Sequence, residues 1–232
     1  MRRSATTDRP PRGPEGGAAA AGAPRPRRRR RRAAWLVGVL VVLAAVGVGW
    51  YQVHPQMPGW YARLWYPLEH EETVREEAAR NGLDPALVAA VIDTESGFVA
   101  DSRSGQGAVG LMQVQPDTAR FVAGLPDRPA PSPDRIEEAG VNIAYGTRFL
   151  RYLVDRYGSV DLALVAYNGG PANLGRWLED AQARGEALRV PDDVPFAETR
   201  GFVTKVREAT GIYRRAYGDR LAGAGDGPSS GP

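Results

Sequence analysis

The distribution of apolar and polar residues divides the chain into a short N-terminal part and a longer C-terminal part. Residues 33–50, AAWLVGVLVVLAAVGVGW, contain no charged side chain. A run of this length is sufficient to cross the hydrocarbon core of a bilayer as a helix. From about residue 69 onward, apolar positions recur with helical spacing, and no strand-like alternation persists. The pattern therefore predicts one apolar helix followed by a single all-α domain.

Capping residues indicate where the helices of this domain begin and end. Asp84 followed by Pro85 is a typical helix start, with an N-cap acid and a proline in the first turn, and it predicts a helix over residues 85–96. The same reasoning predicts helices that begin near residues 69 and 116, separated from the later ones by a proline-rich loop at 123–134. Further helices are predicted over about 136–157, 161–167, 171–184 and 198–217.

The flanking segments complete the predicted organisation of the chain. The domain is expected over 69–220, followed by a disordered Gly- and Ser-rich tail at 221–232. Residues 52–68 are expected to form a juxtamembrane connector. The aromatic side chains of this connector could lie at a lipid interface or pack on the domain, and the sequence does not choose between these two positions.

Charge makes a membrane anchor the preferred interpretation of the apolar segment. Residues 1–32 hold eleven arginines against Asp8 and Glu15, a net charge of +9, so the remaining 200 residues carry −6 of the total +3. Positive charge beside a membrane span retains that end in the cytoplasm. We therefore expect 1–32 to be a disordered cytoplasmic tail and 33–51 to be a transmembrane anchor. A cleaved signal peptide is the main alternative, and a buried core helix is disfavoured because the segment has no amphipathic stripe.

Glu95 is the first candidate for chemistry. In the predicted helix it shares a face with Val88, Val91 and Ile92, through the spacing i, i+3, i+4 and i+7. Burial disfavours the charged form of a carboxyl and raises its pKa, which suits a general acid at neutral pH. The alternative is that Glu95 bends out to solvent at the helix end. Neighbouring Asp93 points away from this face and is expected to be a solvated charge.

Four short segments follow one another at characteristic intervals. They are Glu95-Ser96-Gly97-Phe98, Gly110-Leu111-Met112-Gln113, Ala166-Tyr167-Asn168-Gly169-Gly170 and Glu198-Thr199-Arg200-Gly201-Phe202-Val203. In this order the segments resemble the signature of the soluble-lytic-transglycosylase (SLT) family of the lysozyme superfamily, over about residues 69–217. The resemblance implies an all-α, lysozyme-like transglycosylase SLT domain, here preceded by a single N-terminal transmembrane helix.

The resemblance also implies roles for individual residues. Glu95 matches the sole catalytic acid of the family, and Ser96 matches a serine that helps to order the active site. The substrate-binding residues implied in this way are Ser96, Met112, Gln113, Tyr167 and Asn168. Structural alternatives remain open, because Met112 could be a core side chain and Asn168 a turn residue. The sequence departs from the family at Phe202, where tyrosine is usual.

The activity implied is that of a bacterial peptidoglycan lytic transglycosylase. Such an enzyme cleaves the MurNAc-GlcNAc β-1,4 bond without water and leaves 1,6-anhydro-MurNAc ends, with one glutamate acting first as acid and then as base. Two alternatives remain. One is a hydrolytic muramidase of the same fold, which needs a second carboxylate opposite the first. The other is a non-catalytic wall-binding module, since fold alone does not fix function.

Composition limits the remaining possibilities. The chain has no cysteine, which excludes disulfides, thiolate metal sites and a cysteine nucleophile. No His, Asp and Glu residues have metal-ligand spacing, so we expect no metal and no cofactor. The expected partners are peptidoglycan glycan strands and the membrane, through the N-terminal helix, and not nucleic acid. The expected place is the bacterial cytoplasmic membrane, as a single-pass monomer with its catalytic domain on the extracytoplasmic side.

Overall fold

The computed structural model describes residues 35–43, 45–47, 49, 58–126 and 128–223. The chain separates into two units, Met1–Trp50 and Tyr51–Pro232. In the first unit, residues 35–43, 45–47 and 49 are helical. Within the described residues, no helix combines the length and apolar character that crossing a bilayer requires. Parts of the predicted span, its arginine-rich flank and the predicted tail from residue 224 lie outside the described residues.

The second unit is helical, as the sequence predicts. Its helices are α2 (Gly59–Ala62), α3 (Glu71–Arg80), α4 (Pro85–Ser96), α5 (Pro116–Ala123), the 3-10 turn η2 (Pro133–Arg135), α6 (Ala139–Tyr157), α7 (Val160–Gly169), α8 (Pro171–Ala183) and α9 (Ala197–Leu221). The only β-type pairing among the described residues is two isolated antiparallel bridges, Arg103 with Val109 and Val109 with Val114.

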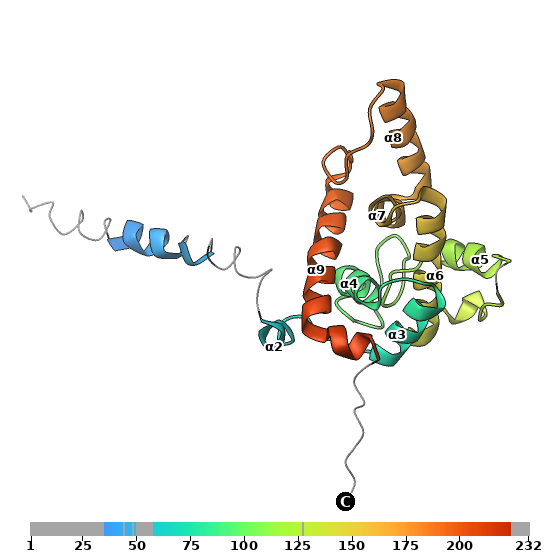
Figure 1. Ribbon diagram of the computed structural model, residues 1–232, viewed down its shortest axis with the longest axis horizontal. Coiled ribbons are helices and arrows are strands. Elements are labelled where there is room, and N and C mark those ends of the chain that lie inside the picture. Colours follow the sequence, from blue (N-terminus) through green and yellow to red (C-terminus); the bar gives the residue numbers. More distant parts are fainter. Residues whose placement is uncertain (1–34, 44, 48, 50–57, 127, 224–232) are drawn as a thin grey trace, which may run out of the picture. The chain divides into compact units, whose positions relative to one another are not determined.

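Helix α4 lies at the centre of this unit and packs most extensively against the long helix α9 (Figure 1). The helix begins as predicted, because the Asp84 side chain accepts a hydrogen bond from the Ala86 N–H and Pro85 occupies the first turn. It ends at Gly97, which adopts a left-handed conformation with φ +59°. Every residue from Ala86 to Ile92 is buried, so α4 is enclosed on all its faces and carries Glu95 on its last turn.

The predicted connector at 52–68 is part of the folded unit from residue 58 onward. Two tyrosine hydroxyls of α9 donate to its backbone, Tyr217 to the Tyr66 carbonyl at 2.8 Å and Tyr213 to the Pro67 carbonyl at 2.9 Å. Gly59 lies so close to α9 that an added Cβ would meet the Arg215 carbonyl oxygen at 2.8 Å. Of its aromatic side chains, Tyr61 and Tyr66 pack against the core, whereas Trp60 and Trp65 are exposed.

Candidate active site

A cleft of about 410 Å³ opens between the end of α4, the loop before α5, and helices α6, α7 and α9. The residues that line it come from distant parts of the sequence and include Glu95, Gln113, Tyr167, Asn168 and Glu198. The first four of these are residues that the sequence singles out. Together with Glu198, the fold therefore brings two carboxyl groups, two amides and a phenol to a single concave surface.

Glu95 is the acid at the centre of this cleft. Its side chain is partly buried, and burial raises its pKa from about 4.5 to about 7, with a smaller contribution from the negative charge of Glu198. The burial follows from the position of Glu95 on the last turn of an enclosed helix, where Val91 and Ile92 are fully buried. A carboxyl with this pKa is protonated in a useful fraction near neutral pH and can donate its proton to a leaving group.

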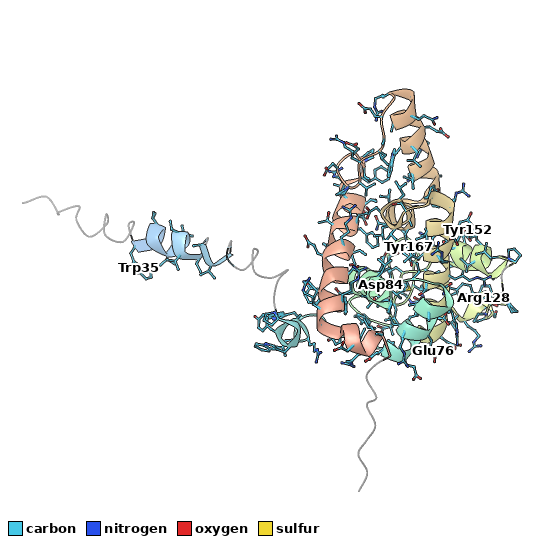
Figure 2. The ribbon with its side chains drawn as sticks, in the orientation of Figure 1. Trp35, Glu76, Asp84, Arg128, Tyr152 and Tyr167 are labelled. Carbon is cyan, nitrogen blue, oxygen red and sulfur yellow. The ribbon has the colours of Figure 1, made fainter. Side chains whose placement is uncertain are left out.

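Tyr167 belongs to helix α7 and lines the same cleft as Glu95; it is labelled in Figure 2. Its hydroxyl donates to the Met112 carbonyl at 2.8 Å. Burial, followed by the charge of Glu95, raises the pKa of Tyr167 well above its ordinary value, so the phenol stays neutral. The ring of Phe202 lies parallel to that of Tyr167, with centroids 6.4 Å apart, and Phe202 is buried. Phe202 thus packs against the ring of Tyr167, and it contributes no hydroxyl to the site.

Gln113 occupies a tight turn that presents it to the cleft. Its φ is +47°, a left-handed conformation that side chains other than glycine seldom adopt. Its side-chain amide donates to the carbonyls of Gly110 at 2.9 Å and Ser102 at 3.2 Å, which holds the turn closed. Strained backbone of this kind is often found at binding sites. The amide oxygen of Gln113 is left as the acceptor on this side of the cleft.

Asn142 of α6 anchors the same turn from the core. Its fully buried side chain accepts from the Met112 N–H at 2.8 Å and donates to the carbonyls of Val109 at 2.9 Å and Ile136 at 2.8 Å. Gly110 is packed so closely on this amide that an added Cβ would lie 2.4 Å from the Asn142 Nδ2 atom. One buried asparagine therefore fixes the loop that carries Gln113.

Asn168 links two walls of the cleft. Its Oδ1 atom accepts a hydrogen bond of 2.8 Å from the Thr199 hydroxyl, which joins the end of α7 to the start of α9. Gly169 follows it directly, and an added Cβ there would meet the Thr199 Oγ1 atom at 3.1 Å. This close approach keeps Glu198, the neighbour of Thr199, at the edge of the same cleft.

Two of the six predicted site residues do not line the cleft. Ser96 lies one residue beyond the acid, and its hydroxyl donates to the Leu111 carbonyl at 2.8 Å, which ties the end of α4 to the following loop. The side chain of Met112 is fully buried against Gly146 and Thr147, while its carbonyl holds Tyr167. A contact of either residue with substrate stays a prediction.

Two carboxyl groups behave differently from what the sequence indicates. Glu198 lines the cleft with Glu95, and no spacing in the sequence places these two carboxyl groups together. The only signal was its place immediately before Thr199-Arg200 in the last motif. The expectation that Asp93 is a solvated charge is wrong, because it is partly buried near Tyr213 and burial raises its pKa to about 6.

Metal binding has no support in the part of the chain that the structure describes. No group of three or more histidine, cysteine, aspartate or glutamate side chains is arranged to hold an ion there.

Comparison with known proteins places the chain in a family. The sequence profile of the Transglycosylase SLT domain matches residues 72–190. The chain is 29% identical over 157 residues to the soluble lytic murein transglycosylase of Escherichia coli K12, which covers 67% of this chain and 24% of that protein. It is 31% identical over 165 residues to the membrane-bound lytic murein transglycosylase C of Yersinia enterocolitica, covering 61% of this chain and 46% of the relative.

A solved structure agrees with the sequence comparison. The X-ray structure of an inactive glutamate-to-glutamine mutant of the lytic transglycosylase Slt from Pseudomonas aeruginosa superposes with a TM-score of 0.58 at 31% identity, over 67% of this chain and 25% of that one. The chain spans about a quarter of the length of the Escherichia coli and Pseudomonas relatives. The match of sequence and fold shows that the chain belongs to the transglycosylase SLT domain family, with an all-helical, lysozyme-like fold.

Proposed function

We propose that the protein is a peptidoglycan lytic transglycosylase that cleaves the β-1,4 bond between MurNAc and GlcNAc. The observation that carries this proposal is the position of Glu95, a partly buried acid with a pKa of about 7 that lines a cleft with amides, a phenol and one further carboxyl, Glu198. The relatives named as lytic murein transglycosylases support the substrate class. The inactive glutamate mutant of the Pseudomonas relative supports the need for one glutamate.

In the proposed mechanism, Glu95 acts twice. Protonated Glu95 first donates its proton to the glycosidic oxygen as the bond to the anomeric carbon breaks. The N-acetyl group of the muramic acid stabilises the positive charge that develops there. The ionised carboxylate then removes the proton of the sugar's own 6-hydroxyl, whose oxygen bonds to the anomeric carbon. The product carries a 1,6-anhydro end, no water is consumed, and Glu95 regains its proton.

The other cleft residues have binding and positioning roles in this proposal. Gln113 and Asn168 offer amide groups to sugar hydroxyls and N-acetyl groups, and Tyr167 offers an aromatic face. Ser96 and Met112 act indirectly, because the Ser96 hydroxyl and the Met112 carbonyl fix the loop and the phenol around the acid. Sites of this kind fix orientation with a few polar groups on a largely uncharged surface.

A hydrolytic muramidase is the second candidate, and Glu198 is the observation that favours it. A hydrolase needs a second carboxylate to activate water or attack the sugar, and Glu198 lines the same cleft as Glu95. We favour the single-acid mechanism because the relatives are named lytic transglycosylases. The charge of Glu198 raises the pKa of Glu95 and so preserves the acid form under either mechanism. The two mechanisms leave chemically different ends on the glycan.

Release of soluble fragments from purified peptidoglycan tests the proposed function. We expect the wild-type chain to release fragments and Glu95→Gln to lose at least about 1,000-fold of that rate, since the proton donor is gone. Asp93→Asn is the matched control. Asp93 lies on the same helix as Glu95, is partly buried and has a raised pKa, but it does not line the cleft. A folded wild-type chain that releases nothing, or equal losses in the two variants, contradicts the proposal.

We also propose that residues 33–51 anchor the protein as a single-pass, monomeric enzyme of the bacterial cytoplasmic membrane, with residues 1–32 in the cytoplasm. The support is the run of uncharged residues at 33–50 after six consecutive arginines. A membrane-bound relative exists, which shows that the family includes such proteins. In this arrangement the cleft faces peptidoglycan on the extracytoplasmic side.

A further inference from the structure

Aromatic side chains continue the cleft wall outward along helices α5 and α6. Thr118 of α5 and Phe149 of α6 both line the cleft. One helical turn further along, α5 carries Phe121 and α6 carries Tyr152, and residues three apart lie on the same face of a helix. Figure 2 labels Tyr152 beside α5 and Tyr167 closer to the centre of the domain.

The rings form a continuous chain of contacts. The centroid of Phe149 lies 5.6 Å from that of Tyr167, and the centroid of Phe121 lies 6.4 Å from that of Phe149. Phe121 and Tyr152 meet edge-to-face at 4.9 Å. The row therefore begins at the phenol beside the candidate acid and ends on the outer surface of α5.

The outer end of this row is partly open to solvent. Helix α5 packs into the core through Ala119 and Val122, which are fully buried, whereas Phe121 is 45% exposed. Tyr152 is held in place at its edge, because its hydroxyl accepts a hydrogen bond of 3.0 Å from Arg156. Large exposed apolar side chains that adjoin a binding cleft commonly belong to it.

We propose that Phe121, Phe149 and Tyr152 form an aromatic platform that binds sugar rings of the glycan strand beyond the bond that is cleaved. The occupant is a polysaccharide because the three aromatic rings carry no charge themselves and continue the wall of the cleft. An aromatic face attracts the C–H groups on one side of a pyranose ring, and the Thr118 hydroxyl and Gln115 amide in the adjoining wall can bond sugar hydroxyls. This inference rests on the proposed function of the cleft.

Binding of glycans of graded length tests the platform. The full-length chain carrying Glu95→Gln is titrated with peptide-free peptidoglycan glycans of two, four, six and eight sugars, and Kd is measured for each. We expect affinity to rise with length. Adding Phe121→Ala should raise the Kd of the longest glycan by about ten-fold, which corresponds to the loss of one aromatic contact. The Kd of the disaccharide should change much less. Phe121→Trp, which keeps an aromatic face, restores the affinity for long glycans.

The control is Trp60→Ala, which removes an exposed aromatic from α2, a helix that packs on α9 and does not line the cleft. This variant is expected to have the same Kd as its parent, the Glu95→Gln chain, for glycans of every length. The platform is overturned if Phe121→Ala leaves every Kd unchanged, or if it weakens all lengths equally, as a general disturbance of the fold would. If the parent binds no glycan of any length, the proposed function of the cleft fails, and the platform fails with it.

Discussion

At the scale of single residues, the raised pKa of Glu95 makes a prediction about stability. Its folded-state pKa of about 7 lies above its ordinary value of 4.5, so the folded chain binds more protons between these pH values. Stability therefore falls as pH rises through this window, and the full cost of the buried charge is present above pH 7. We expect Glu95→Gln to be more stable than wild type by about 1–3 kcal/mol at pH 8.

The gain in stability from Glu95→Gln should shrink as pH falls through 7 and disappear below about 4.5, where the glutamate is neutral in both states. Urea denaturation of both proteins at pH 5 and pH 8 checks it. A gain that is the same at both pH values would mean that the glutamine improves packing. It would contradict the claim that the charged carboxylate of Glu95 destabilises the folded chain.

Glu198 makes a second prediction at the residue scale, now for activity. Its negative charge helps to raise the pKa of Glu95, so Glu198→Gln should lower that pKa. The acid form of Glu95 is then lost at lower pH, and the alkaline limb of the kcat/KM profile should move to lower pH.

Glu179→Gln, an exposed glutamate on α8 that does not line the cleft, is the control for Glu198→Gln and should leave the limb in place. Loss of activity in Glu198→Gln, together with reducing ends in the products of the wild-type chain, would instead assign Glu198 a direct role in hydrolysis.

At the scale of elements, the loop that carries Gln113 depends on Asn142. Asn142→Ala removes three buried hydrogen bonds and leaves the Met112 N–H and two carbonyls without that partner. We expect a loss of about 2–4 kcal/mol in the free energy of unfolding, because buried polar groups without partners are costly. Asn142→Asp keeps the acceptor for the Met112 N–H but places a buried carboxylate oxygen against the carbonyls of Val109 and Ile136, so its loss at neutral pH should be at least as large. Equal stability of Asn142→Ala and wild type contradicts this account of the loop.

Helix ends were predictable because their signals are local. Asp84 and Pro85 set the start of α4 with no help from the rest of the chain, and the structure confirms that start. The apolar stripe of Val88, Val91 and Ile92 was less informative than it looked. Helix α4 is buried all round, so burial near Glu95 and Asp93 comes from the helices packed around it and not from one face.

The parts of the site that sequence reasoning missed depend on long-range packing. Glu198 lies 103 positions after Glu95, and only the contact of α4 with α9 brings both to one cleft. Asn142 has no local signal of its anchoring role, because its partners are backbone groups of other segments. Met112 was found through its motif, but its side chain fills the core while its carbonyl faces Tyr167. A motif identifies a position and does not say which atoms of it act.

At the scale of the whole molecule, the proposed anchor predicts how the chain partitions. We expect the full-length protein to stay with membranes after alkaline extraction. Leu40→Arg combined with Val41→Arg should release it, because each arginine at the centre of a span costs about 3 kcal/mol in insertion. Leu40→Ala with Val41→Ala is the matched control and should remain membrane-bound. Release of the wild-type chain would support a cleaved or peripheral segment in place of the anchor.

The central claim is that Glu95 completes the reaction without water, and the products formed in ¹⁸O-labelled water test it most directly. Peptidoglycan is digested with the full-length protein in that solvent, and the fragments are identified by mass. The account predicts fragments with 1,6-anhydro ends, which carry no ¹⁸O and are about 18 Da lighter than the corresponding unlabelled hydrolytic fragments. It predicts that Glu95→Gln forms none of these fragments. Reducing ends that carry ¹⁸O would contradict it and assign the second carboxylate of the cleft to the activation of water.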